Sequence, residues 1–185
     1  LLIASEYEIY WYSLHKKSIE SRTQTKIAVA PLKWIKIGND KLKTYQFLNR
    51  IGVNMAPFFY YQKERESWIS GLDLKELRNK DFPLFLKPKN GTSNKGIIKI
   101  DNLEKLKRIT SNTCLEEIVL QKSLLSNTGS FEVTSSIVIS CRGDIDFVPF
   151  HAKRILNKGI SWFVEKYSSK ELDKTVLLIA NNMTN

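Results

Sequence analysis

The residues between Lys87 and Gly96 have the types and the spacing needed to bind phosphate. Lys87 ends the apolar run 82–86, and Pro88 follows it directly. The loop that comes next combines two glycines, two small hydroxyl residues and two further lysines. Such a loop offers several backbone N–H donors that can close over phosphate groups. A lysine at the end of an apolar strand either binds an anion or extends its ammonium group to water.

Two known phosphate-binding patterns do not fit this loop. Gly91 and Gly96 have the separation of the glycines in GxxxxGK[ST], but Ile97 follows Gly96 where that pattern requires lysine. The pattern GxGxxG is also absent. Because a glycine-containing hairpin tip also occurs for structural reasons alone, a phosphate-binding role depends on the elements around it.

The elements next to the loop are predicted to be strands and one helix. Residues 82–87 and 97–100 are short apolar runs that predict an antiparallel hairpin with a long polar tip. Asn102 starts a helix over residues 103–109, and the run 118–121 predicts a further strand. These elements would hold the lysine and the glycines in place.

The first fifty residues predict α/β structure. Residues 1–5 and 26–30 predict buried strands, and the apolar spacing over 6–20 predicts a helix between them. A β-α-β unit implies a parallel sheet that is covered on both faces. A second helix is expected between Asp40, whose side chain can cap the first turn, and Gly52. Its apolar side comprises Leu42, Tyr45, Phe47, Leu48 and Ile51.

The remaining segments are predicted from charge and apolar spacing. Residues 63–80 are rich in charge and predict one or two surface helices. Residues 131–140 predict a strand that turns at 142–144 into a second strand over 147–152. Residues 171–180 predict a final amphipathic helix.

The charge of the chain favours an anionic ligand. Lysine and arginine together number 29 against 19 acidic residues, a net charge of +10. The surplus is spread along the sequence, whereas nucleic-acid-binding proteins more often gather it in one stripe or arm. The four tryptophans Trp11, Trp34, Trp68 and Trp162 are also scattered, so they offer no stacking platform for bases. We therefore expect a polyphosphate ligand rather than nucleic acid.

The sequence also predicts the setting of the protein. No apolar run approaches the roughly 20 residues of a membrane span, so we expect a soluble protein with no membrane partner. Cys114 and Cys141 lack the spacing of a zinc site and are interpreted as reduced thiols packed in the core of a cytoplasmic protein. His15 and His151 have no visible partner and are interpreted as packing or surface residues.

Five motifs in order along the chain resemble the ATP-grasp superfamily. They are Asn39-Asp40-Lys41, Gly52-Val53-Asn54-Met55-Ala56-Pro57, Phe82-Pro83-Leu84-Phe85-Leu86-Lys87-Pro88 with the loop to Gly96, Ile118-Val119-Leu120-Gln121-Lys122, and Phe131-Glu132-Val133-Thr134. The likeness is greatest to the carbamoyl-phosphate-synthase-like and biotin-carboxylase-like branch. The implied fold class is α/β (α+β): two ATP-grasp lobes, one with an antiparallel nucleotide-binding hairpin, preceded by part of a parallel α/β domain. The implied divisions are 1–38 for the end of that preceding domain, 39–120 for the small lobe and 121–185 for the start of the large lobe.

The resemblance implies how the nucleotide phosphates are bound. Lys41 and Lys87 match lysines that contact phosphate, although Lys41 could equally be a solvated lysine of a first helical turn. The loop matches the segment that covers the phosphates, where the family often has three or four glycines and this chain has two. The implied contacts in the loop are Asn90, Gly91, Thr92, Ser93, Lys95 and Gly96.

The resemblance also implies the contacts to the rest of the nucleotide. Gln121, Lys122 and Leu124 match the hinge whose main chain pairs with adenine, and glutamate often stands in the family where this chain has Gln121. Glu132 matches the acid that holds the ribose hydroxyls, with a structural salt bridge as the competing interpretation. Arg154 resembles an arginine that orients a carboxylate or an acyl phosphate.

The function implied by the resemblance is that of an ATP-dependent carboxylate–amine (C–N) ligase, which activates a carboxylate as an acyl phosphate. ATP and Mg²⁺ are the implied cofactors, small-molecule carboxylates and amines are the implied partners, and a homodimer is compatible with the resemblance. The family places its magnesium-binding Glu and Glu-x-Asn after a helix like 171–180, so we expect no metal ligands here and expect them beyond Asn185. The sequence thus reads as an inactive part of a longer chain. The alternatives are a non-catalytic nucleotide-binding or regulatory module and, less favoured, a basic nucleic-acid-binding domain.

Overall fold

The computed structural model describes residues 5–62, 67–69, 77–91, 95–124, 131–140, 149–157 and 160–184. The helices are α1 (Glu6–Arg22), α2 (Leu32–Gly38), α3 (Lys41–Arg50), α4 (Leu103–Thr110) and α5 (Lys170–Thr184), with short 3₁₀ turns at Asn79–Asp81 and Leu115–Glu117. The strands are β1 (Phe58–Gln62), β2 (Ser67–Ile69), β3 (Leu84–Pro88), β4 (Ile98–Ile100), β5 (Ile118–Lys122), β6 (Glu132–Ser136), β7 (Phe150–Asn157) and β8 (Ile160–Tyr167). Among the described residues, no helix is long and apolar enough to cross a membrane.

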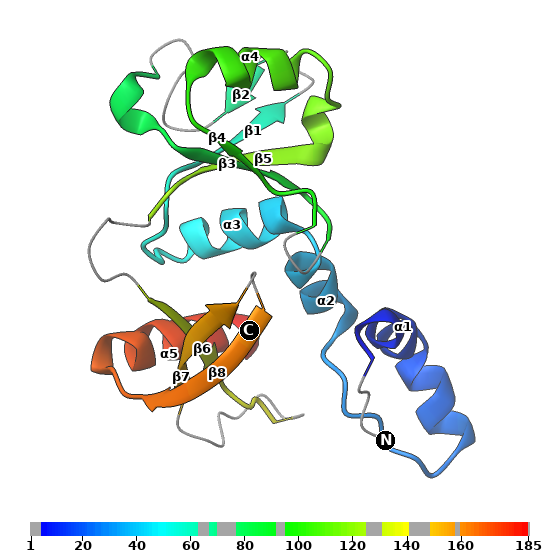
Figure 1. The fold of residues 1–185 in the computed structure, drawn as a ribbon. Coiled ribbons are helices and arrows are strands. Elements are labelled where there is room, and N and C mark those ends of the chain that lie inside the picture. The colour runs from blue at the N-terminus through cyan, green and yellow to red at the C-terminus, as the bar shows by residue number, and fades with distance from the viewer. Residues whose placement is uncertain are drawn as a thin grey trace.

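The strands form two antiparallel sheets. The larger sheet has the order β2-β1-β5-β3-β4, and β3 and β4 form the predicted hairpin. The smaller sheet has the order β6-β7-β8, and α5 lies against it (Figure 1). In Figure 1, α4 covers one face of the larger sheet, and α3 lies between the larger and the smaller sheet.

The main hydrophobic core lies between the larger sheet and α4. Successive side chains of a strand point to opposite faces, so each of these strands supplies alternate residues to the core. The buried cluster comprises Phe59 of β1, Leu84 and Leu86 of β3, Ile100 of β4, Leu106 of α4, and Ile118 and Leu120 of β5, with Leu77. The intervening residues of β1, β3 and β5 therefore face α3.

The predicted helix caps are confirmed. Asp40 accepts a hydrogen bond from the backbone N–H of Lys43 at the start of α3, and Asn102 accepts one from Lys105 at the start of α4. Both contacts satisfy amide groups that the first helical turn leaves without a partner. Gly52, which follows α3, has a φ of +80°, a conformation that favours glycine.

The predicted strand over residues 26–30 is wrong, because only a single bridge residue, Ala28, occurs there. The backbone of this segment bonds instead to side chains of α1. Glu20 accepts from the Ile27 N–H, and Ser13 and Lys16 donate to the carbonyls of Ala30 and Val29. The β-α-β unit is thus not formed by the described residues, and the pairings among the described strands are antiparallel. Residues 1–4 of the other predicted strand lie outside the described residues.

Other segments also differ from the sequence prediction. Ser67–Ile69 lies in the part predicted as surface helix, but it is a strand that pairs with residues 60–62 of β1. Aromatic residues favour strands, and here the aromatic residues of the two strands outweigh the helix preference that the charged residues indicated. The helix α2 was not predicted, although Pro31 before it and Gly38 at its end are both typical helix boundaries. Cys114 is exposed, not packed in the core, and Cys141 lies outside the described residues. The predicted turn at 142–144 also lies outside them.

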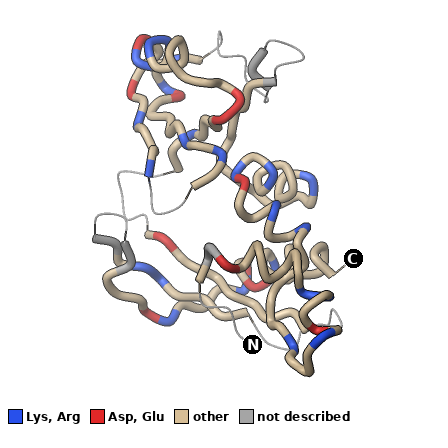
Figure 2. Tube along the Cα trace, turned by 90° about the vertical axis from the view of Figure 1, so that its right-hand side faces the viewer, with Lys and Arg blue, Asp and Glu red and all other residues tan. Residues whose placement is uncertain are grey.

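Positive charge is spread over the molecule rather than gathered at one end. Figure 2 shows Lys and Arg along the helices and strands of both the upper and the lower part of the described chain. The dispersed charge expected from the sequence is therefore confirmed for these residues.

Candidate functional site

The site begins on the face of the larger sheet that lies toward α3. Leu84 and Leu86 of β3 are buried in the core, so Lys87 points to the opposite face. Leu120 of β5 is buried in the same core, so Gln121 also points toward α3. Strand alternation thus places the lysine and the glutamine on one surface.

Three side chains meet on that surface. The Lys87 ammonium donates a hydrogen bond to Oε1 of Gln121 over 2.5 Å. The hydroxyl of Tyr45, from α3, donates to the same oxygen over 3.2 Å. The Tyr45 ring also packs on Phe58 of β1, with 5.2 Å between the ring centroids. The helix and two strands therefore converge on one amide oxygen.

Lys41 connects α3 to the glycine-containing loop. Its backbone N–H donates to the carbonyl of Lys89 over 2.8 Å, and its ammonium donates to the carbonyl of Gly91 over 2.7 Å. The loop is further anchored where Lys89 donates its N–H to Glu117 over 2.8 Å. The first residue of the helix is therefore fixed against the base of the loop.

The backbone conformation on the two sides of the loop favours glycine at positions 91 and 96. Gly91 and Gly96 have φ values of +122° and +73°, which L side chains rarely adopt. A Cβ atom at Gly96 would lie 2.8 Å from Cγ of Pro88. Both glycines and Asn90 and Lys95 are exposed, whereas Thr92 and Ser93 lie outside the described residues.

The two lysines form a positive centre without a carboxylate in direct contact. Burial is the main cause that lowers the pKa of Lys87, and the Lys41 charge lowers it further, while Glu132 opposes the shift. Burial also lowers the pKa of Lys41, against the opposing effect of Asp40. Within the described part of the chain, both ammonium groups are held by neutral oxygens and neither forms an ion pair. Such a centre attracts an anion.

Glu132 and Arg154 lie together on the smaller sheet. They face each other across β6 and β7, and Nη1 of Arg154 lies 3.7 Å from Oε2 of Glu132. Glu132 also acts electrostatically on Lys87 of the larger sheet. The proposed ribose acid and the proposed catalytic arginine are therefore neighbours, with Glu132 near enough to influence the lysine centre.

The hinge after β5 is held by its main chain and by a buried carboxylate. Lys122 and Ser123 donate their N–H groups to the carbonyls of Pro57 and Pro83. The Lys122 ammonium lies 2.9 Å from Oδ1 of the buried Asp81. The Arg78 N–H, the Lys122 ammonium and nearby positive charge lower the pKa of Asp81. The Lys122 side chain is thus engaged with Asp81, while Leu124 exposes 73% of its surface beside the hinge.

The Tyr45 hydroxyl and the side chain of Gln121 belong to the site but are not among the predicted contacts. Tyr45 was interpreted only as part of the apolar side of a helix, and Gln121 only as a main-chain contact. A signal did exist, because a tyrosine hydroxyl on an apolar face needs a polar partner. The identity of that partner depends on two residues 76 positions apart, which local patterns do not reveal.

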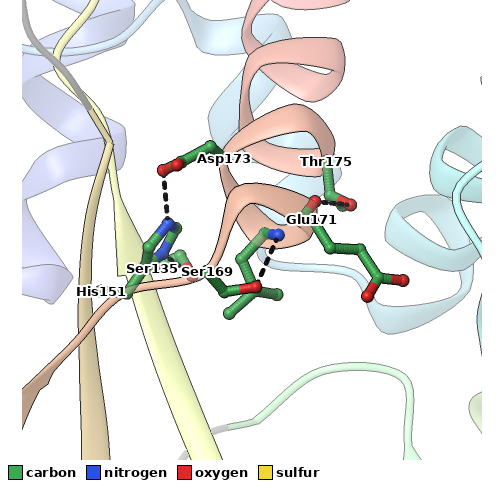
Figure 3. Close-up of polar contacts among 7 residues, drawn as sticks. Ser135, His151, Ser169, Glu171, Asp173 and Thr175 are labelled. Atoms are coloured by element: carbon green, nitrogen blue, oxygen red, sulfur yellow. Dashed lines mark hydrogen bonds and ion pairs between the residues drawn. The ribbon is translucent and has the colours of Figure 1, made fainter.

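His151 is a buried polar residue, 3% exposed, and is part of a different polar contact. Figure 3 shows it between the smaller sheet and the first turn of α5. Its Nδ1 lies 2.8 Å from Oγ of Ser135, and its Nε2 lies 2.9 Å from Oδ1 of Asp173. Because a carboxylate only accepts, Nε2 carries a proton and donates to Asp173. The imidazole therefore connects β6, β7 and α5.

Magnesium does not fit the residues described here. No group of three or more His, Cys, Asp or Glu among them could hold a metal ion. Glu132, which influences Lys87, is paired with Arg154, and Asp40, which influences Lys41, caps α3. No step of the chemistry is therefore assigned to a metal held by these residues.

Comparisons with known proteins give structural matches only. No protein-family model matches the sequence, and the curated proteins give no match. The biotin carboxylase domain of 2-oxoglutarate carboxylase from Hydrogenobacter thermophilus, solved with MgADP, ADP and bicarbonate, is 15% identical with a TM-score of 0.66. That match covers 99% of this chain and 42% of the other.

Two further structures match over most of the chain. N5-carboxyaminoimidazole ribonucleotide synthetase from Thermus thermophilus is 18% identical with a TM-score of 0.60, covering 92% of this chain and 44% of the other. D-alanine–D-alanine ligase from Bacillus anthracis, solved with ATP, is 14% identical with a TM-score of 0.56. That match covers 98% of this chain and 64% of the other. The chain thus spans about two fifths to two thirds of these proteins. At these identities the matches establish the fold, and the chain has the ATP-grasp fold.

Proposed function

We propose that this chain binds ATP on the face of the larger sheet that lies toward α3. The observation that carries the proposal is the pair of lysines, Lys41 and Lys87, which come from different elements and are held by neutral oxygens. Lys41 bonds to the Gly91 carbonyl and Lys87 to the Gln121 side chain. Two ammonium groups without a carboxylate partner repel each other and gain free energy when a phosphate lies between them. Several structural neighbours were solved with adenine nucleotides, which supports ATP as the ligand.

The remaining residues are assigned roles around that phosphate site. The N–H groups of the 90–96 loop would close over the phosphates, with Asn90, Gly91, Thr92, Ser93, Lys95 and Gly96 as the contacts. The main chain at Gln121, Lys122 and Leu124 would pair with adenine. Because the N–H of Lys122 already bonds to Pro57, the N–H of Leu124 is the better candidate donor in the described hinge.

Glu132 would bind the ribose of ATP, and Arg154 would bind the second substrate. Glu132 can accept from two ribose hydroxyls, and Arg154 can bind a carboxylate or an acyl phosphate through two parallel N–H donors. Their separation of 3.7 Å places both groups at one position of the smaller sheet. Binding of ribose by Glu132 would weaken that ion pair.

We further propose that the whole protein is an ATP-dependent carboxylate–amine ligase of the carbamoyl-phosphate-synthase-like and biotin-carboxylase-like branch. In such a reaction ATP would phosphorylate a carboxylate, and an amine would displace the phosphate from the acyl phosphate. The residues of this chain would supply positioning and charge neutralisation, which provide most of the catalysis in phosphoryl transfer. The neighbours with ligase activity in their names support this reaction class.

The experiment that tests ATP binding is calorimetric titration of the chain with ATP, adenosine and inorganic triphosphate. The proposal expects ATP to bind more tightly than either part, because the lysines act on phosphate and the hinge acts on adenine. A non-catalytic nucleotide-binding module gives the same binding result and differs only in the turnover of the whole protein. Binding of oligonucleotides in preference to ATP would instead indicate the nucleic-acid-binding alternative.

A further inference from the structure

We propose that Ser135, His151 and Asp173 form a second site, in which the Ser135 hydroxyl is a nucleophile toward esters of carboxylic acids. His151 is the general base, and Asp173 is the positioning residue that orients the imidazole. The three side chains come from β6, β7 and α5, and 16 and 22 positions separate them along the chain. The site goes beyond the proposed binding of ATP and does not depend on it.

The positions of the protons in this site follow from its two hydrogen bonds (Figure 3). Oδ1 of Asp173 lies 2.9 Å from Nε2 of His151, and a carboxylate oxygen accepts, so the ring proton is on Nε2. In the neutral imidazole, Nδ1 then has a lone pair, and it lies 2.8 Å from Oγ of Ser135. The Ser135 hydroxyl donates to that lone pair. A hydroxyl, a base and a carboxylate in this order are the arrangement that activates serine as a nucleophile.

The nucleophile and the base differ in their exposure to solvent. His151 is buried, so water does not compete for its two hydrogen bonds. Ser135 is exposed on β6, so a substrate in solution can reach it. The base is therefore shielded while the nucleophile is accessible.

The edge position of β6 supplies a donor for the negative oxygen that forms when serine attacks a carbonyl group. Among the described strands of the smaller sheet, β6 pairs only with β7. Along an antiparallel strand, the N–H groups of alternate residues point away from the partner strand. The N–H of either Ser135 or the next residue, Ser136, therefore points outward from the sheet. Backbone N–H groups at the nucleophile or directly after it commonly stabilise such an oxygen.

The second site lies on the opposite face of the smaller sheet from Glu132 and Arg154. Ser135 and His151 lie opposite each other across β6 and β7, and His151 points toward α5. Glu132 and Arg154 also lie opposite each other, an odd number of residues away along each strand. Because successive side chains of a strand alternate between faces, this pair points away from α5. The nucleotide contacts and the second site therefore share no side chain.

The reaction of the second site is transfer of an acyl group to Ser135, followed by hydrolysis. Oγ of Ser135 forms a bond to the carbonyl carbon, and its proton passes to Nδ1 of His151. The bond from the carbonyl carbon to the leaving alcohol breaks, and the alcohol takes that proton. Water, deprotonated by the same nitrogen, then attacks the acyl-serine, which releases the carboxylic acid and restores the hydroxyl. Water is the only co-reactant.

The test is covalent labelling of the chain with an alkyl phosphonofluoridate in the absence of ATP. Oγ of Ser135 displaces fluoride from phosphorus, and mass spectrometry of the peptides locates the adduct. We expect labelling of Ser135 to be about 10²–10⁴-fold faster in the folded chain than in the urea-unfolded chain, the range for general-base catalysis. Ser135→Ala should lose this label. Thr134→Val, which removes the neighbouring exposed hydroxyl of β6, should keep it.

Asp173→Asn tests the positioning role of the carboxylate. An asparagine amide can donate to Nε2 as well as accept from it, so it no longer holds the ring proton on that nitrogen. We expect the labelling of Ser135 to slow at least tenfold in this variant while thermal unfolding shows that it is folded.

Two results would overturn the proposal. One is labelling of Ser135 that is no faster in the folded chain than in the unfolded chain. The other is an equal labelling rate in the original chain and in folded Asp173→Asn, as expected if the carboxylate only anchors α5. The first comparison uses the original chain alone, so it decides the question even if a variant fails to fold.

Discussion

The chemistry of this chain at the scale of single residues depends on two lysines whose environment disfavours their charge. Lys87 is half-buried, and Lys41 lies close enough to lower its pKa further. Here both ammonium groups contact neutral oxygens, so their charge remains available to an anion.

The first prediction concerns the dependence of ATP affinity on pH. Phosphate favours the ammonium form, so the pKa of Lys87 is lower in the free protein than in the complex. The ATP affinity is therefore highest below the pKa that Lys87 has in the free protein, and it falls as the pH rises through that pKa. Because this pKa is lowered, the fall begins at a lower pH than it would for an ordinary lysine. Calorimetry from neutral pH to about pH 10 would show this decline, and Lys87→Met should flatten it. If the ATP affinity does not change over that pH range, Lys87 does not bind the phosphates.

At the scale of elements, a buried polar residue helps to fix the hinge, and another helps to fix the helix α5. Asp81 connects the 3₁₀ turn before β3 to Lys122 at the end of β5. His151 connects β6, β7 and α5. Both contacts join segments that are far apart in the sequence, so each should contribute to the stability of its sheet.

The second prediction concerns Asp81. Its pKa in the folded protein is lowered, so it adds stability above its unfolded pKa and loses that stability as the pH falls through the folded pKa. Asp81→Asn should therefore be less stable than the original chain at neutral pH, and the difference should narrow below about pH 4. Denaturant unfolding at several pH values measures this. Asp101 is exposed and pairs with Lys99 and Lys105, so Asp101→Asn is the control. We expect it to lower the free energy of unfolding by less than Asp81→Asn does.

The third prediction concerns His151. Replacement by phenylalanine keeps an aromatic ring but leaves Ser135 and Asp173 without their partner. Loss of a buried, charge-assisted hydrogen bond should cost about 1.5–3 kcal/mol of unfolding free energy. His151→Gln, which retains a donor and an acceptor, should recover part of the loss. Equal stability of both variants and the original chain would show that the imidazole contact adds nothing.

At the scale of the whole molecule, the sequence predicted the elements with strong local signals. Asp40 and Asn102 cap their helices, and Lys87 ends a hairpin strand, as the residue types alone indicate. Segments whose partners are distant were predicted less well. The backbone of residues 26–30 bonds to α1 side chains, and Ser67–Ile69 pairs with an aromatic strand. The meeting of Tyr45, Gln121 and Lys87 likewise depends on strand register, which no local pattern encodes.

The most direct test of the account is the affinity for ATP after Lys87→Met, which keeps the aliphatic stem and removes the charge. The exposed Lys107 of α4, on the opposite side of the larger sheet, provides Lys107→Met as the matched control. We expect calorimetry on folded Lys87→Met to show that the free energy of ATP binding is weakened by about 1.5–3 kcal/mol, the range for a charge-assisted hydrogen bond. Lys107→Met should bind ATP as the original chain does. Equal ATP affinity in the two variants, with both folded, would show that Lys87 does not bind the phosphates of ATP.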